Sequence, residues 1–271
     1  MTTDIWNAEQ YLKFEADRLR PFLDLVAHMD TDDVRVAAVV DLGCGPGNAT
    51  ALLADWWPDA RILGVDASQA MIDAAREHAV PGRVEFELGD VWGWAPEEPV
   101  DVLLANAVLQ WVPGHLDLLA GLASHVAPGG LLGFQVPGNF DEPSHTVLGE
   151  LRGSAKWRDK VSSPLAQPAV HAPAEYLATL VDSGLEPDVW ETTYMHILPS
   201  DPDADGPSGV TEFVGGTTLR PILNVLSKED AAEFTAEYDA LIRAAYPVRT
   251  LSDRTVQLLP YRRIFAIGRQ S

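Results

Sequence analysis

The segment Val39–Gly47 constrains the fold of this chain more than any other. It reads Val-Val-Asp-Leu-Gly-Cys-Gly-Pro-Gly, an apolar run that ends in an acid and continues into three alternating glycines. Glycine adopts positive φ and has no side chain, so a glycine turn before a helix brings backbone N–H groups close to a ligand. We therefore predict a buried strand that leads into a ligand-binding turn at a helix N-terminus.

Acidic residues mark the ends of this strand and of the next two predicted strands. Asp41 precedes the glycines, Asp66 closes the strand Arg61–Asp66, and Asp90 closes the segment Val84–Asp90. The carboxyl ends of parallel strands meet at one edge of a sheet, so we expect the three carboxylates to line one site. The competing interpretation is that the glycines form an ordinary tight turn and the acids cap helices.

The chemistry of these residues favours S-adenosylmethionine (SAM) over other nucleotides. Gly43–Gly47 has the spacing G-x-G-x-G, whereas a dinucleotide site usually reads G-x-G-x-x-G, so a nicotinamide oxidoreductase is disfavoured. Asp66 can accept hydrogen bonds from both ribose hydroxyls, and Asp90 can accept one from an adenine amino group. The loop has no Lys or Arg to hold phosphates. The prediction is an adenosine ligand without phosphates.

The order of the expected elements predicts an α/β fold of the Rossmann-like type, with a seven-stranded, mostly parallel sheet. We expect strands at 36–42, 61–66, 84–88, 100–106, 131–136, 188–198 and 261–267. We expect helices at 4–30, 48–57, 69–78, 115–126, 174–183, 210–225 and 228–245. The chain is interpreted as a single domain, 1–271, with an N-terminal helical cap at about 1–30 and lid insertions at about 138–173 and 209–246.

Charge and composition restrict the partners. The 19 basic and 40 acidic residues give a net charge of −21, which disfavours nucleic acid because its phosphates require cationic contacts. No apolar run approaches the ~20 residues of a membrane span, and the polar N-terminus does not resemble a secretory signal. Cys44 is the only cysteine, so no intrachain disulfide forms. We expect a cytoplasmic monomer without a metal, since the histidines lack metal-ligand spacing.

Five segments together resemble the class I SAM-dependent methyltransferases. They are Val39–Gly47, Asp66–Ser68 with Met71, Gly89-Asp90, Asp101–Asn106 and Pro128–Gly130. The resemblance implies SAM as methyl donor and S-adenosylhomocysteine as product. It implies cofactor binding by Tyr11, Phe14, Arg18, Asp41, Gly43, Cys44, Gly45, Asp66, Ala67, Met71, Asp90, Val91, Asn106 and Ala107.

Further segments resemble the trans-aconitate 2-methyltransferase family. They are Trp6–Pro21, Ala105–Trp111, Pro143–His145, Trp190–His196 and Leu219–Pro221. This resemblance implies esterification of one carboxylate of trans-aconitate, a small tricarboxylate. The acidic loop Ser200–Gly209 departs from the family, because it lengthens the path to the Leu-Arg-Pro segment. The alternatives are another small carboxylic acid, a carrier-bound acid, or a SAM-binding module without catalysis.

The implied reaction needs substrate clamps rather than a general base. A carboxylate is ionised at neutral pH, and a sulfonium methyl group transfers by in-line displacement once the two are aligned and water is removed. Guanidinium groups bind carboxylates bidentately, so Arg220 is the first candidate. Tyr194 and His196 are two positions apart in a strand and share a face. The further candidates are Gln110, Trp111 and Arg263, with Arg18, Arg20, Arg152 and Arg262 as other arginines outside the sheet.

Overall fold

A computed structural model describes residues 15–161, 169–201 and 206–271, which divide into two compact units. The sheet unit comprises Ala16–Pro137, Gln167–Thr192 and Arg263–Ser271. The helical unit comprises Met1–Glu15, Gly138–Ala166 and Thr193–Arg262. Both units are therefore built from separate stretches of the chain, and strands β6 and β8 each continue from one unit into the other.

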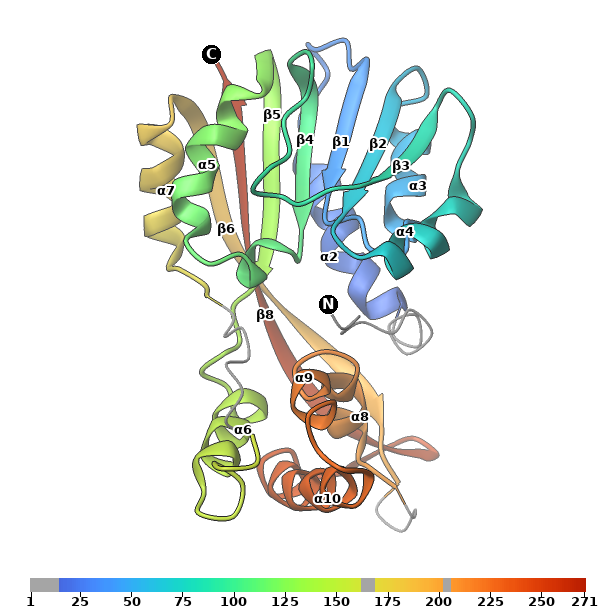
Figure 1. Cartoon of the computed structure of the whole chain (residues 1–271), viewed down its shortest axis with the longest axis vertical. Helices are drawn as coiled ribbons and strands as arrows, with labels where there is room; N and C mark the ends of the chain where they lie inside the picture. The colour runs from blue at the N-terminus through green and yellow to red at the C-terminus, as the bar shows by residue number, and fades with distance from the viewer. Residues whose placement is uncertain (1–14, 162–168, 202–205) are drawn as a thin grey trace. The chain divides into compact units, whose positions relative to one another are not determined.

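The central sheet has the strand order β3-β2-β1-β4-β5-β8-β6, and a short β7 pairs with β8 (Figure 1). The strands are β1 Ala38–Leu42, β2 Arg61–Asp66, β3 Val84–Leu88, β4 Val100–Asn106, β5 Val126–Pro137, β6 Leu185–Pro199, β7 Arg249–Leu251 and β8 Arg254–Gln270. Strands β1 to β5 pair in parallel, and β8 is antiparallel to β5. The Rossmann-like fold class is confirmed. The described residues form eight strands rather than the expected seven, because β7 forms a short hairpin with β8.

Strand β1 lies at the point where the strand order reverses direction. Asp41 pairs in register with Gly64 of β2 on one side and with Leu104 of β4 on the other. In open α/β sheets, ligands bind outside the carboxyl ends of the strands at such a reversal. The topology therefore places the glycine segment after β1 beside the ends of β2 and β4.

Neighbouring residues of a strand point to opposite faces of the sheet, and helices cover both of these faces. Helices α5 (His115–Ser124) and α7 (Pro173–Asp182) pack in one core cluster with Leu103 and Phe134 (Figure 1). Met29, just after α2 (Glu15–His28), approaches Gly133 and Leu104 from the other face. The central strands β1 and β4 consequently consist mostly of buried apolar residues, as expected where a sheet is covered on both sides, whereas the outer strands β3 and β6 contain many exposed residues.

Several predicted bounds need correction within the sheet unit. The described part of the first helix is α2, while residues 1–14 of the expected 4–30 lie outside the described residues. The expected helix 69–78 is α4 (Gln69–Ala75) followed by a 3-10 turn, η1 (Arg76–His78). Strand β5 begins five residues earlier than expected, at Val126, and its pairing with β4 shifts register between Val100 and Val102. Helix α3 (Asn48–Trp56) follows the glycine loop as expected.

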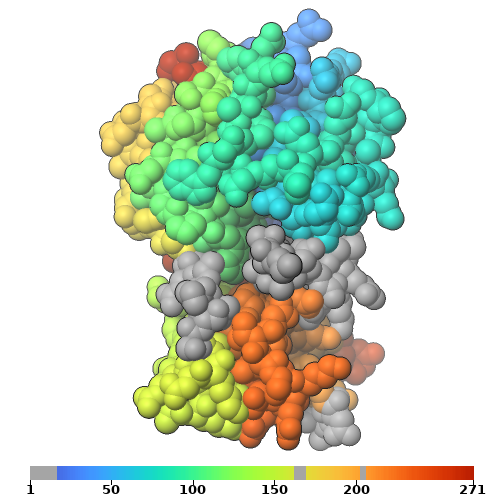
Figure 2. Space-filling view, in the orientation of Figure 1, coloured from blue at the N-terminus to red at the C-terminus, as the bar shows by residue number. Residues whose placement is uncertain are grey.

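The helical unit has a hydrophobic core of its own. It contains α6 (Pro143–Gly153), α8 (Gly209–Gly215), α9 (Arg220–Leu223) and α10 (Lys228–Ala245). Trp157, Phe234 and Tyr238 are fully buried in this core together with Phe213 of α8. Figure 2 shows the yellow-green surface of the α6 segment beside the orange surface of the later helices, and α6 packs directly on α10.

The expected single helix 210–225 is wrong. The chain forms α8, a turn and then α9. Gly215 and Gly216 weaken the helix at this point, and Pro221 stands at the first turn of α9, where its missing N–H costs nothing. The break places Arg220 at the start of a new helix. No helix in the described stretches is long and apolar enough to cross a membrane.

Candidate active site

The glycine segment after β1 is a tight turn with an open side. Gly43 and Gly45 have φ values of +77° and +57°, which side chains rarely adopt. A Cβ at Gly43 would lie 2.5 Å from Cγ2 of Val108, whereas a Cβ at Gly45 would have no heavy atom within 4 Å. Gly43 is thus needed for internal packing, while Gly45 borders space that a ligand can approach.

Asp66 at the end of β2 ties this turn to the next one. Its Oδ2 accepts a hydrogen bond from the backbone N–H of Gly45 at 2.9 Å, and its Oδ1 accepts one from the N–H of Ser68 at 2.8 Å. Ser68 in turn caps α4, because its Oγ accepts from the N–H of Met71 at 3.3 Å. The carboxylate is therefore held in one orientation at the carboxyl edge of the sheet, as a ribose-binding acceptor would need to be.

Asp41 is buried and differs from Asp66 in its surroundings. Its Oδ2 accepts a hydrogen bond from the Thr50 hydroxyl at 2.6 Å, and its Oδ1 is buried with no hydrogen-bond partner. Burial raises the pKa of Asp41 from 3.8 to about 6; the Thr50 bond opposes this rise and the charge of Asp66 adds to it. Burial, with the nearby Asp41 and Asp66 charges, also raises the pKa of the Cys44 thiol. Cys44 is accordingly a protonated thiol and a poor nucleophile.

The residues expected around an adenine lie at the ends of β2 and β3. The Asp90 side chain is exposed, and its Oδ1 accepts the backbone N–H of Trp92 at 2.8 Å. Val91 and Met71 are buried, and Ala67 is exposed. The exposed carboxylate of Asp90 is an acceptor of the kind that an adenine amino group requires.

A strained residue follows β4. Ala107 has a φ of +53°, an uncommon conformation for a residue with a side chain. Its N–H donates to the Gln135 carbonyl at 2.9 Å, and its carbonyl accepts from Nε2 of Gln110 at 2.7 Å. These two bonds hold the peptide groups of Ala107 in place directly after Asn106, at the edge of the sheet where β1 and β2 also end.

A polar chain crosses three strands at the same edge. Gln135 Nε2 on β5 donates to Asn106 Oδ1 on β4 at 2.6 Å, and Arg263 Nη1 on β8 donates to Gln135 Oε1 at 3.2 Å. Two of the predicted candidates, Arg263 and Asn106, therefore share Gln135 as a partner, and Gln110 is linked to Gln135 only through the backbone of Ala107. Sequence reasoning missed Gln135. The signal available was a glutamine inside the apolar strand Leu131–Pro137, where a buried amide requires polar partners.

Three predicted substrate candidates lie in the helical unit. Tyr194 and His196 are buried on one face of β6, and Met195 between them is half exposed. The His196 ring packs 5.0 Å from the Phe213 ring, so its surroundings are aromatic. Arg220 borders a cavity of about 240 Å³. The cavity is lined by Pro207, Thr211, Glu212, Gly215, Leu219, Arg220, Leu223, Asn224 and Thr235.

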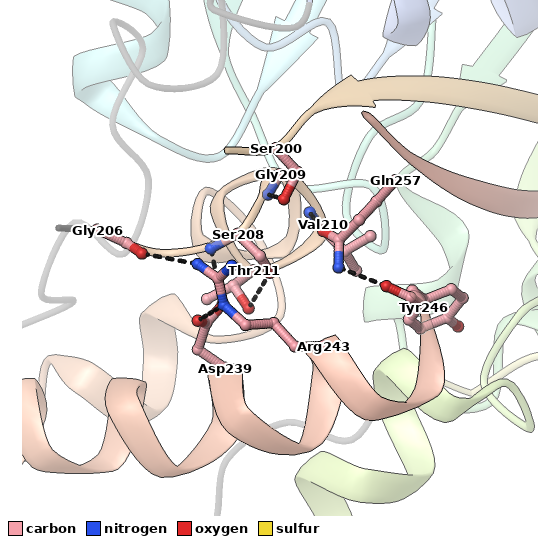
Figure 3. A network of polar contacts seen from close by, with 10 residues as sticks. All are labelled: Ser200, Gly206, Ser208, Gly209, Val210, Thr211, Asp239, Arg243, Tyr246 and Gln257. Carbon is pink, nitrogen blue, oxygen red and sulfur yellow. Dashed lines mark hydrogen bonds and ion pairs between the residues drawn. The ribbon is translucent and has the colours of Figure 1, made fainter. Parts of the chain in front are cut away.

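A buried polar network fixes the start of α8 (Figure 3). The N–H of Ser208 donates to Asp239 Oδ1 at 2.7 Å, and the N–H of Val210 donates to Gln257 Oε1 at 3.0 Å. Asp239 Oδ2 also accepts from Nε of Arg243 at 2.6 Å. Burial alone would raise the pKa of Asp239, but the bonds from Ser208 and Arg243 outweigh it and lower the pKa. The helix that precedes Arg220 is thus anchored on α10 and β8.

The structure describes only some of the remaining predicted residues. Tyr11 and Phe14 lie outside the described residues. Arg18 lies half-buried on α2, and Trp111 lies half-buried in the 3-10 turn η2 (Leu109–Trp111). Nowhere in 15–161, 169–201 and 206–271 do His, Cys, Asp and Glu side chains gather in a group that would hold a metal ion.

Comparisons with known proteins identify relatives of this chain. Residues 39–130 match the family described as a methyltransferase domain. The chain is 45% identical to a Streptomyces coelicolor protein named trans-aconitate 2-methyltransferase, over 99% of this chain and 88% of that protein. It is 42% identical to an Azoarcus protein of the same name, over 97% and 98% of the two chains.

A solved structure supports the fold. Magnesium protoporphyrin IX methyltransferase from Synechocystis, with bound S-adenosylhomocysteine, has a TM-score of 0.52 and 18% identity to this chain. The likeness covers 98% of this chain and 88% of that one.

Proposed function

The chain belongs to the trans-aconitate 2-methyltransferase family, and we propose that it transfers a methyl group from SAM to one carboxylate of trans-aconitate. The likeness to the curated relatives carries this proposal, because it extends through both the sheet unit and the helical unit. The protein is a SAM-dependent methyltransferase, and S-adenosylhomocysteine is its second product.

The sheet unit supplies residues that suit SAM. Gly45 leaves room for a ligand, Asp66 is oriented by two backbone N–H groups, and Asp90 is an exposed acceptor. The loop carries no cation that would favour phosphates. We assign the ribose to Asp66, the adenine amino group to Asp90 with Met71 and Val91 as apolar walls, and the methionine portion to the peptide groups at Asn106 and Ala107. The other assigned cofactor residues are Tyr11, Phe14, Arg18, Asp41, Gly43, Cys44 and Ala67.

The proposed step needs no proton acceptor. SAM supplies a methyl group bound to a positively charged sulfur, so the carbon–sulfur bond breaks as an oxygen–carbon bond forms. The substrate carboxylate is already ionised, because carboxyl groups have pKa values near 4. The chain must therefore hold the carboxylate about 3 Å from the methyl carbon and keep water away from it.

Arginines are proposed to bind the carboxylates that do not react. A protein with a net charge of −21 repels a tricarboxylate unless cations are placed locally. Arg263 is buried in the sheet unit and donates a hydrogen bond to Gln135, and Arg220 borders the cavity of the helical unit. We propose Arg220 as the principal clamp. The further proposed contacts are Arg263, Gln110, Trp111, Tyr194 and His196.

The insertions 138–173 and 209–246 are proposed to act as a lid that excludes water. They contribute to a unit with its own hydrophobic core, which is what a segment that moves as one body requires. We also propose a cytoplasmic monomer. The single cysteine is buried, as suits a reducing compartment, and the large net charge opposes self-association.

The test is the specificity constant for methyl transfer to a panel of acids. The panel contains trans-aconitate, cis-aconitate, citrate, isocitrate and a malonyl carrier protein. The proposal predicts the highest kcat/KM for trans-aconitate. A preference for the carrier would favour the carrier-bound alternative, although the acidic surface opposes an acidic carrier. SAM binding without transfer to any acid would favour a non-catalytic module.

A further inference from the structure

The segment Pro143–His145 at the start of α6 holds a part-buried histidine cluster to which the proposed reaction gives no role. The Nδ1 atom of His145 lies 3.1 Å from Ser144 Oγ and 3.4 Å from Asn139 Nδ2. Its Nε2 atom lies 3.3 Å from the hydroxyl of Thr218. Asn139 and Ser144 are fully buried, and the ring of Phe140 packs edge-on at 5.0 Å.

The imidazole of His145 links two elements of the helical unit. Its Nδ1 atom faces the side chains of Ser144 and Asn139, and its Nε2 atom forms a hydrogen bond with the Thr218 hydroxyl. Burial lowers the pKa of His145 to about 4, so the ring is neutral near pH 7. One ring nitrogen of a neutral imidazole donates and the other accepts, and a hydroxyl can take either role. The bond to Thr218 therefore forms with either tautomer.

Ser144, which precedes His145 on α6, is held by two hydrogen bonds that do not involve Thr218. The N–H of Ser144 donates to the Tyr246 hydroxyl at 3.1 Å, and the Tyr238 hydroxyl donates to the Ser144 carbonyl at 2.7 Å. Both tyrosines belong to the α10 segment, and Tyr238 is fully buried. His145 therefore directly follows a residue whose backbone is held by the α10 segment.

The other side of the cluster is the turn that leads to Arg220. Thr218 lies between α8 and α9, and the N–H of Arg220 donates to the Thr217 carbonyl at 3.2 Å. The polar network of Figure 3 fixes the beginning of α8, and at its end the N–H groups of Thr217 and Leu219 both donate to the Val214 carbonyl. These backbone bonds close the turn, and the His145–Thr218 bond ties the turn to α6.

We propose that His145 is a positioning residue, which holds Thr218 and thereby fixes Arg220 for binding a carboxylate of the substrate. This inference rests on the proposed function, because it requires Arg220 to bind substrate. His145 itself neither accepts a proton nor touches the reacting atoms. It acts in substrate binding, so its loss raises KM for the acid more than it changes kcat or SAM affinity.

The test compares Thr218→Val with Thr218→Ser. Valine keeps the shape of threonine and removes the hydroxyl, whereas serine keeps the hydroxyl. We expect Thr218→Val to raise KM for trans-aconitate about fivefold, with the dissociation constant of SAM unchanged. Thr218→Ser should keep the wild-type KM. His145→Ala should reproduce the valine variant, and His145→Gln, which retains a donor, should recover part of the loss.

Arg220→Ala distinguishes a failure of the proposed substrate clamp at Arg220 from a failure of the positioning role of His145. Alone, it should raise KM more than Thr218→Val does, and the double variant should show no additional rise, because both substitutions act through one side chain. If Arg220→Ala leaves KM unchanged, the arginine clamp is wrong and the positioning role fails with it. If Arg220→Ala raises KM but Thr218→Val does not, only the role of His145 is overturned. The role of His145 would also be overturned if the KM increases of the two single variants added up in the double variant. It would be overturned too if Thr218→Val reduced SAM affinity and stability as much as it raised KM.

Discussion

Asp41→Asn tests whether the cofactor loop is built on a buried carboxylate that resists ionisation. In the folded protein, one carboxylate oxygen of Asp41 accepts a hydrogen bond from the Thr50 hydroxyl, and the other oxygen is buried with no hydrogen-bond partner. Between about pH 4 and 6 the folded state keeps a proton that the unfolded chain has released. The free energy of unfolding therefore falls as pH rises through this range, and it levels off above the folded pKa.

The magnitude follows from the pKa of Asp41. Its rise from 3.8 to about 6, at about 1.4 kcal/mol per pKa unit, corresponds to a full cost of about 3 kcal/mol. Roughly half of this cost, ~1.4 kcal/mol, develops between pH 5 and 8. Asparagine does not ionise, so the Asp41→Asn variant should lack this component at both pH values.

The assay is urea unfolding followed by tryptophan fluorescence at pH 5 and 8, without SAM, because a bound ligand would add its own stabilisation. The stability of Asp41→Asn relative to the wild type should increase by ~1.4 kcal/mol from pH 5 to pH 8. Thr50→Val is the matched control: it removes the hydroxyl that favours the ionised form and should enlarge the pH dependence. An unchanged difference between Asp41→Asn and wild type at the two pH values would refute the reasoning.

Four further substitutions test the cofactor loop and the α8 anchor. Asp66→Ala should weaken SAM binding by about 1–3 kcal/mol in calorimetry, because a fixed acceptor is lost; unchanged affinity would remove Asp66 from the site. Gly43→Ala should destabilise the protein more than Gly45→Ala, because only a Cβ at Gly43 would collide with Val108. Gly45→Ala should mainly impair SAM binding. Equal effects of the two variants on stability and on SAM affinity would contradict the different roles given to the two glycines. Asp239→Asn should lower the free energy of unfolding by about 1–3 kcal/mol, whereas the control Glu229→Gln, at an exposed position, should leave it unchanged. Equal free energies of unfolding for the two variants would contradict the anchoring of α8 by Asp239.

The sheet was predictable from sequence because its signals are local. Strands β2 and β4 are mostly apolar and β3 alternates apolar and acidic residues; each ends at a polar residue or a turn, and the expected bounds agree with the structure. The glycine loop was predictable for the same reason. Gly43 and Gly45 need positive φ, and only a few residue types tolerate it at low cost.

The helical unit was less predictable because its elements depend on tertiary contacts. The apolar pattern of 210–225 continues through Gly215 and Gly216, so the pattern indicates one helix, while the structure has two. The partners of Asp239 and His145 are distant in sequence, at Ser208 and Thr218, and no spacing rule connects them. Gln135 was missed because its partners lie on two other strands.

The most direct test of the central claim is to identify the product formed from trans-aconitate. The protein is incubated with trans-aconitate and SAM labelled with ¹³C in the methyl group, and the methyl carbon is followed by NMR. The account predicts a single new methyl ester signal, formed in step with S-adenosylhomocysteine. Bound SAM with no methyl ester, or a label attached to an atom other than a carboxylate oxygen, would contradict it.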